Sequence, residues 1–225
     1  AGNRLPLYND LSKFNADELA RQFNVTAKHS IEKTAAENHD AFLTVSDITA
    51  NECKFLLSRE PNGITPNGFE NDFVWSGDEY YAKRDEARKA MITVAEACLG
   101  RKFAAEPLIV GTSGRYEFRN KGLDVFLESL KKLAASEKLQ REVLAYITVP
   151  AGNRGPRPDL QAHLADPSKP IDPNQYRHST HLLENLAGDA IAASIRGSVL
   201  DAPESKVQVI FVPTYLNKAD GIFNK

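Results

Sequence analysis

Apolar residues over the last two thirds of the chain alternate between two kinds of spacing. Short continuous apolar runs at residues 108–111, 143–149 and 207–212 are typical of strands buried on both faces of a sheet. Residues 122–139 place Leu and Phe side chains three and four positions apart, as one face of a helix requires. A charged helix is expected over residues 78–99, before the first strand. This alternation predicts an α/β fold with a parallel, Rossmann-like sheet and flanking helices.

The first third of the chain repeats this alternation with shorter elements. Apolar residues recur every four positions over residues 16–38, after a cap at Asn15, and predict one long helix. A strand-like run at residues 41–45 and a second helix, capped at Thr49, are expected to follow.

Residues 64–68, with the sequence ITPNG, predict a domain boundary. Proline biases the residue before it toward an extended conformation, and Asn-Gly favours a left-handed turn. We therefore divide the chain into residues 1–68 and residues 69–225.

Proline content separates one further segment from the rest. Six of the twelve prolines fall within residues 150–173, which predicts a long irregular surface loop. Two helices are expected after it, at residues 174–186 and 189–199.

Charge and hydropathy exclude several classes of partner. The chain has 28 Lys and Arg against 30 Asp and Glu, so no basic field is available to gather nucleic acid. No apolar run is long enough to span a membrane, and no leader opens the chain, so we expect a cytoplasmic protein. The chain begins at Ala1 and its one methionine is Met91, which suggests a segment of a longer protein.

Cysteine and histidine offer little for a metal site. We interpret Cys53 and Cys98 as buried, reduced thiols, with a disulfide as the alternative. His178 and His181 would share one helical face, but a zinc site needs further ligands, and we favour a structural role.

The segment 111–122, GTSGRYEFRNKG, carries the candidate chemistry. It lies between a predicted buried strand and a helix N-terminus, where α/β sheets bind ligands. Three cations, Arg115, Arg119 and Lys121, stand before that helix, where its dipole disfavours them. A bound phosphate, held also by backbone N–H groups, would compensate them. Neutralisation by Glu117 and Asp124 in solvent is the other interpretation, and the spacing leaves both open.

Several blocks, in the same order along nearly the whole chain, resemble the eukaryotic-type glycogen synthases. The most specific is GRYEFRNKG at residues 114–122, whereas TPNG is common among nucleotide-sugar transferases. The other blocks are AGN…LYNDLSKFN (1–15), IEKTAAE (31–37), TVSDITANE (44–52), ITPNGF (64–69), THLLEN…SIRG (180–197) and VQVIFVPTYL (207–216).

The resemblance implies a GT-B architecture, with two facing Rossmann-like domains and the active site in the cleft between them. Residues 1–68 would end the N-terminal, acceptor-side domain and include the crossover. Residues 69–225 would begin the C-terminal, nucleotide-sugar-binding domain. Arg115 and Lys121 would bind the donor diphosphate. Gly114 would allow the donor to approach the backbone closely, and Arg119 is a secondary candidate for diphosphate binding.

The same resemblance implies a retaining glucosyltransferase of glycogen biosynthesis. It would move glucose from UDP-glucose or ADP-glucose to the 4-hydroxyl of an α-1,4-glucan, without a metal or other cofactor. An oligomer is possible in the full-length protein. The alternatives are another GT-B enzyme, of the sucrose or sugar-phosphate synthase type, and a non-catalytic nucleotide- or glucan-binding module.

The catalytic glutamates of the family are expected beyond Lys225, and its first glycine-rich turn before Ala1. We therefore predict that a polypeptide of residues 1–225 alone does not extend glucan. Transfer of labelled glucose to glycogen measures this, and extension above background by the isolated polypeptide would contradict it.

Overall fold

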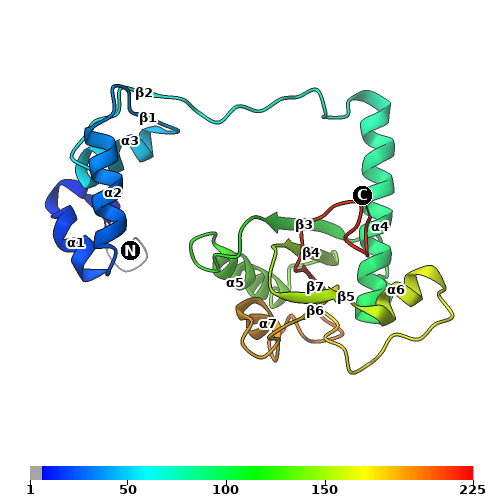
Figure 1. The fold of residues 1–225 in the computed structure, drawn as a ribbon. Coiled ribbons are helices and arrows are strands. Elements are labelled where there is room, and N and C mark those ends of the chain that lie inside the picture. The colour runs from blue at the N-terminus through cyan, green and yellow to red at the C-terminus, as the bar shows by residue number, and fades with distance from the viewer. Residues whose placement is uncertain (1–6, 225) are drawn as a thin grey trace. The chain divides into compact units, whose positions relative to one another are not determined.

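The computed structural model describes residues 7–224 and divides the chain into two compact units, Ala1–Val74 and Trp75–Lys225 (Figure 1). Residues 1–6, which begin the first block of the resemblance, and Lys225 lie outside the described residues. The assignment of the two parts of the chain to two Rossmann-like domains stays a prediction.

The second unit is built on a parallel sheet of three strands, β3 (Leu108–Ser113), β4 (Val143–Thr148) and β7 (Val207–Val212), in the order β3-β4-β7. Every residue of β7 is buried, including the polar Gln208, as its otherwise apolar sequence predicts. The predicted α/β class with a parallel sheet is confirmed.

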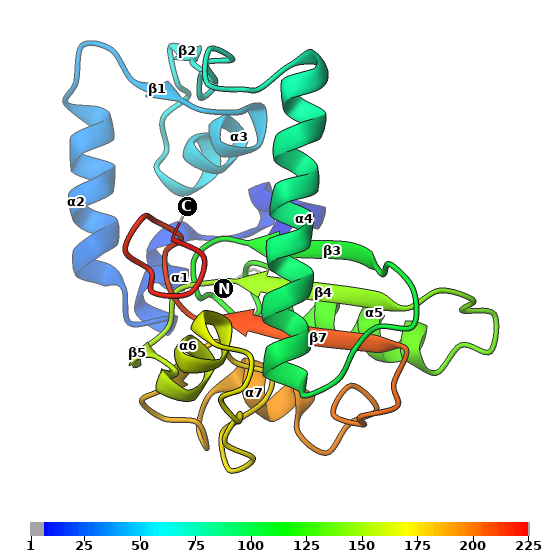
Figure 2. The ribbon, with the colours of Figure 1, turned by 90° about the vertical axis from the view of Figure 1, so that its right-hand side faces the viewer.

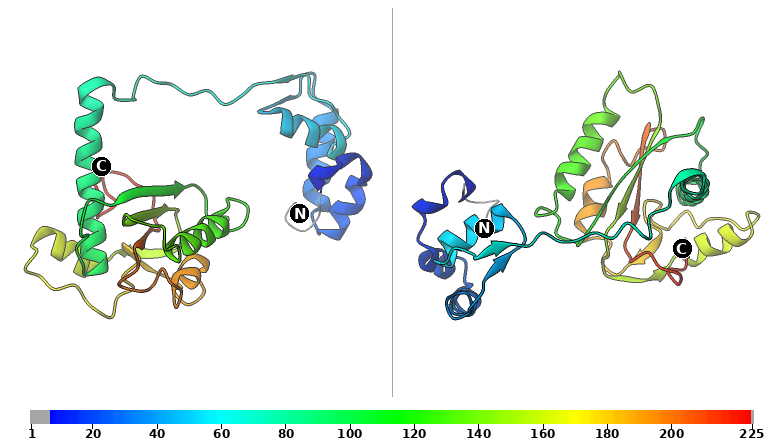
Figure 3. Two further views of the ribbon diagram at one scale, coloured as in Figure 1. Left: turned by 180° about the vertical axis from the view of Figure 1, so that it is seen from behind. Right: turned by 90° about the horizontal axis from the view of Figure 1, so that it is seen from above.

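Helices cover both faces of this sheet. Helices α5 (Leu123–Ala134) and α7 (Ala190–Ile195) lie on one face, and α4 (Gly77–Leu99) and α6 (Pro158–Ala165) lie on the other (Figures 2 and 3).

Strand β4 contributes side chains to a hydrophobic core on each face of the sheet, because successive side chains of a strand point to opposite faces. Val143, Ala145 and Ile147 pack with α5 and α7. Leu144 and Tyr146 pack with α4 and α6. The central strand therefore has no solvent-facing side. None of the described helices combines the length and apolar character needed to cross a lipid bilayer.

The first unit contains α1 (Ala16–Gln22), α2 (Thr26–Glu37) and α3 (Asp47–Leu56). Two short 3-10 turns, Leu7–Asn9 and Leu11–Lys13, precede them. Strands β1 (Leu43–Thr44) and β2 (Gly63–Ile64) form a parallel pair.

The predicted single helix over residues 16–38 is wrong, because the chain turns between α1 and α2. Asn24 adopts a left-handed φ of 54°, and the Val25 N–H donates to the Ala20 carbonyl at 2.8 Å. The Asn24 N–H donates to the Arg21 carbonyl at 3.1 Å, which completes a Schellman motif. The regular apolar spacing continues through the break, so it conceals the helix end.

The cap of α3 also differs from the expectation. Ser46, not Thr49, caps the helix, and its hydroxyl accepts from the Thr49 N–H at 3.2 Å. Both residues are good caps, and the first of them begins the helix.

The segment expected to be a long loop at residues 150–173 contains β5 (Asn153–Pro156) and α6. Pro158 occupies the first turn of α6, where its missing N–H costs no hydrogen bond. The helix expected at residues 174–186 is absent from the described structure. Strand β6 (His181–Leu183) pairs antiparallel with β5 there instead.

We predict that Leu127→Ala lowers the free energy of unfolding by about 2–5 kcal/mol, because Leu127 is fully buried between α5 and the sheet. Val125→Ala, on the exposed side of the same helix, should change it by less than about 0.5 kcal/mol. Urea unfolding of both variants checks this, and equal effects would contradict the assigned core.

Candidate functional site

The three strands of the second unit end together at one edge of the sheet. The parallel register aligns Ser113 with Thr148, and Thr148 with Val212. Hydrogen bonds join the segments that follow β4 and β7. The Ala151 N–H donates to the Pro213 carbonyl at 3.1 Å, and Asn153 Nδ2 donates to the same carbonyl at 2.7 Å. Ligands of open α/β sheets bind at this edge.

The segment after β3, residues 114–122, which we call the cationic segment, contains partly buried aromatic and exposed cationic side chains. Tyr116 and Phe118 pack against the core shared by α5 and α7. Arg115, Arg119 and Lys121 are exposed to solvent. The two aromatic residues therefore anchor the segment, and the cations are displayed above the edge of the sheet.

Glu117 partly neutralises the segment. Its carboxylate lies 3.2 Å from Arg115 Nε and accepts a 3.3 Å hydrogen bond from Asn120 Nδ2. The Arg115 side chain remains 76% exposed, and exposed pairs of this kind contribute about 0–1 kcal/mol. Across residues 7–224, no carboxylate lies within ion-pair distance of the Arg119 or Lys121 side chains.

The N-terminus of α5 is less open than a helix-based phosphate site requires. The Asp124 N–H donates to the Phe118 carbonyl at 3.2 Å, and the Val125 N–H donates to the Asp124 carboxylate at 2.9 Å. These first-turn donors are already used within the chain. An anion at this edge would be held mainly by the cationic side chains and less by helix N–H groups than the sequence predicts.

Two glycines of the 111–122 motif, Gly111 and Gly114, have different surroundings. Gly114 has a φ of 149°, in the region that favours glycine, and a side chain added there would meet only open space. Gly111 lies inside β3, where an added Cβ would come within 3.3 Å of the Tyr146 carbonyl. Gly114 therefore leaves room for a ligand, whereas Gly111 serves the packing of the sheet.

His178 and His181 do not share a helical face, because neither lies in a helix. His178 Nδ1 lies 2.8 Å from the Val209 carbonyl, and its Nε2 lies 3.2 Å from Asp201 Oδ1. Burial holds the pKa of both histidines below the ordinary value, which favours neutral rings. They are structural residues, and the described part of the chain has no group of three metal-ligating side chains.

Both cysteines are buried and unpaired. Burial raises the pKa of the Cys98 thiol to about 12, so it is not a nucleophile at neutral pH.

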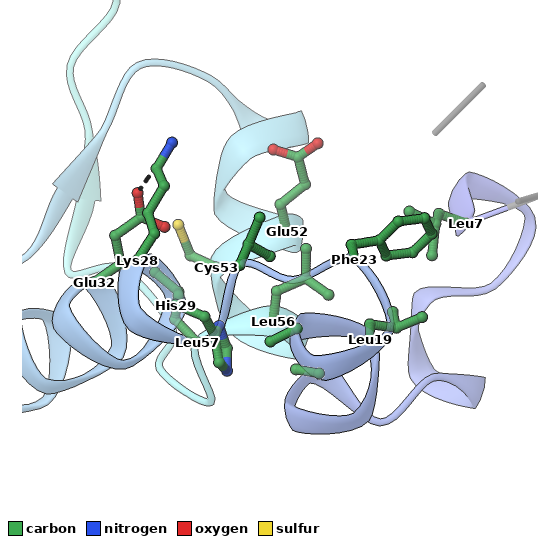
Figure 4. A pocket seen from close by; sticks show the side chains of 13 residues that line it. Leu7, Leu19, Phe23, Lys28, His29, Glu32, Glu52, Cys53, Leu56 and Leu57 are labelled. Atoms are coloured by element: carbon green, nitrogen blue, oxygen red, sulfur yellow. Dashed lines mark ion pairs between the residues drawn. The ribbon is translucent and has the colours of Figure 1, made fainter. Parts of the chain in front are cut away.

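A hollow of about 610 Å³ lies in the first unit and is lined mainly by residues of α1, α2 and α3 (Figure 4). Leu19, Phe23 and Leu56 make most of its surface apolar. The Lys28–Glu32 ion pair, at 3.8 Å, lies at one end of it. Its lining is typical of a packing surface, and none of the candidate diphosphate-binding residues lies in it.

Two residues of the site were missed at the level of sequence. The Tyr116 hydroxyl donates to the Asp189 carboxylate at 2.7 Å, which links the segment after β3 to the start of α7. The R-Y-E-F-R alternation at residues 115–119 was an available signal for the inward direction of Tyr116.

Comparison with known proteins gives one family. The family model described as glycogen synthase matches residues 1–155, which include the cationic segment.

The chain is 35% identical over 150 residues to the glycogen [starch] synthase of Neurospora crassa, covering 64% of this chain and 21% of that protein. It is 32% identical over 160 residues to glycogen [starch] synthase isoform 2 of Saccharomyces cerevisiae, covering 68% and 23%. It is 31% identical over 156 residues to the human liver glycogen [starch] synthase, covering 65% and 22%. The chain thus spans little more than a fifth of the length of these relatives.

We predict that Arg115→Ala and Lys121→Ala each change the free energy of unfolding by less than about 0.5 kcal/mol, because both side chains are exposed. Arg157→Ala is the contrasting arginine variant. Arg157 is buried and holds the Asp159 carboxylate at 2.5 Å, so its removal should cost about 3–5 kcal/mol.

Denaturant unfolding of the three variants measures these differences. A large loss of stability in Arg115→Ala or Lys121→Ala would show that the exposed cations hold the fold together.

Proposed function

This chain belongs to the glycogen synthase family, and from that premise we propose that it is the diphosphate-holding part of a retaining glucosyltransferase. The whole protein would transfer glucose from a nucleotide diphosphate sugar to the 4-hydroxyl of an α-1,4-glucan. The observation that carries the proposal is the display of Arg115 and Lys121 above the carboxyl edge of a parallel sheet. Aromatic anchors beneath them hold the segment in place.

The chemistry of the leaving group requires cations at this position. When the bond between glucose and phosphate breaks, negative charge develops on the departing nucleoside diphosphate. Fixed positive groups stabilise that charge in the transition state, and each such group typically contributes about a hundred- to a thousandfold in rate. The glucosyl group passes through an oxocarbenium-like state to the acceptor hydroxyl.

The two cations would bind the diphosphate in different ways because their charged groups differ in shape. The planar guanidinium of Arg115 offers a fork of N–H donors that matches two phosphate oxygens, whereas Lys121 acts as a compact point charge. Glu117 would release Arg115 readily, because their pair is exposed and weak. Open space beside Gly114 would admit the phosphate close to the backbone. Arg119, on the same segment, is a secondary contact.

We propose that these side chains replace a metal ion in neutralising the diphosphate, and that the donor is UDP-glucose or ADP-glucose. We propose that other parts of the whole protein supply the groups that complete the catalytic site. A near-neutral charge balance, with 28 basic against 30 acidic residues, fits a cytoplasmic enzyme that binds neither nucleic acid nor membrane.

We predict that Arg115→Ala or Lys121→Ala in the full-length protein lowers turnover by about two orders of magnitude or more, since each removes one charge-stabilising donor. Arg119→Ala should have a smaller effect. Lys132→Ala removes an exposed cation from the last turn of α5, far along the helix from the segment, and should leave turnover unchanged.

Steady-state kinetics with UDP-glucose and ADP-glucose as donors and glycogen as acceptor measures this and identifies the donor. Unchanged turnover in both Arg115→Ala and Lys121→Ala would remove the diphosphate assignment. Binding of nucleoside diphosphate without any glucan extension would instead favour a binding module.

A further inference from the structure

Tyr116 is the third residue of the cationic segment, and its side chain packs against the protein core. Its ring packs near Phe211 of β7, with 6.3 Å between the ring centroids. Its hydroxyl donates to Asp189 Oδ2 at 2.7 Å and accepts from the Ile191 N–H at 3.2 Å. The hydroxyl is therefore held by two groups from one short stretch of chain.

Each carboxylate oxygen of Asp189 accepts a hydrogen bond from a different part of the chain. Oδ1 accepts from the Ala192 N–H at 2.8 Å and caps α7, while Oδ2 accepts from Tyr116. The capped start of α7 thus holds the cationic segment near its beginning. Both side chains also line a hollow of about 250 Å³, together with Gly152 and Glu184. The Tyr116–Asp189 contact therefore lies in the wall of a surface hollow rather than deep in the core.

Tyr116 holds the start of the cationic segment, whereas Phe118 anchors its middle. Gly114 and Gly122, both with positive φ, bracket it. Between them, the Glu117 N–H donates to the Arg115 carbonyl at 2.8 Å, which makes Tyr116 the central residue of a γ-turn. With Tyr116 held inward, its neighbour Arg115 is directed to solvent.

We propose that Tyr116 is a positioning residue for the diphosphate-binding cations, held by its hydrogen bond to Asp189, an inference that rests on the function proposed above. The Tyr116–Asp189 hydrogen bond fixes the start of the cationic segment before the ligand binds. Affinity is gained because less conformational freedom is lost on binding.

The hydroxyl is what distinguishes this role from core packing. A phenylalanine would fill the same space and keep the contact with Phe211, so packing alone gives no reason for a hydroxyl here. Burial, followed by the interaction with Asp189, raises the pKa of Tyr116 well above its ordinary value. The phenol therefore remains a neutral donor across the physiological pH range.

The test is a double-mutant cycle on the full-length protein, with UDP and ADP as probes in calorimetric titrations. Tyr116→Phe removes the donor, and Asp189→Asn keeps the oxygen that caps α7 while removing the Oδ2 acceptor. Each variant should weaken binding of the preferred nucleotide about three- to tenfold, the effect of one lost hydrogen bond. The double variant should be no weaker than either single variant, because both remove the same bond.

Tyr146→Phe is the matched control. The Tyr146 hydroxyl also makes a 2.7 Å hydrogen bond, to the Met91 carbonyl, but on the opposite face of the sheet. Its loss should lower stability without changing nucleotide affinity. If Tyr116→Phe behaves like Tyr146→Phe, with lower stability and unchanged affinity, the positioning role is overturned.

Arg115→Ala and Lys121→Ala, titrated alongside, separate this inference from the proposed function. If they abolish nucleotide binding while Tyr116→Phe and Asp189→Asn do not weaken it, the positioning role alone fails. If they leave affinity unchanged, the proposed function fails and the positioning role fails with it. If Tyr116→Phe does not fold, Asp189→Asn reports the loss of the same bond from the other side.

Discussion

Parallel pairing of β3, β4 and β7 in one register is the constraint on which the rest of the second unit depends. It brings the ends of three strands that are distant in sequence to one edge of the sheet. It also makes β4 a fully covered strand, whose alternating side chains require a layer of helices on each face. The segment after β3 must then cross this edge before α5 begins, which is where its cations are displayed.

The alternation within that segment orients its cations. Tyr116 and Phe118 are partly buried against the core, and Arg115 and Arg119 beside them are exposed. Because the Asp124 and Val125 N–H groups are used within the chain, we propose that an anion is held more by the cationic side chains than by the helix terminus. In that proposal, the ligand offsets the energetic cost of placing cations before a helix.

The sheet and its covering helices follow from the sequence because continuous apolar runs and helical spacing are strong local signals. The turn at Asn24 was not predictable from spacing, since the apolar period runs on through a left-handed residue. Residues 174–186 form no helix because β6 pairs with β5, a contact set by distant residues. Arg115 and Lys121 were found through a motif, whereas Asp189 acts across more than seventy residues, a separation that local patterns do not encode.

The most direct measurement is a crystal structure of the full-length protein with bound UDP or ADP. We expect the Arg115 guanidinium and the Lys121 ammonium to lie within hydrogen-bond distance of the diphosphate oxygens, above the ends of β3 and β4. A nucleotide bound away from this edge, with Arg115 still paired to Glu117, would contradict it.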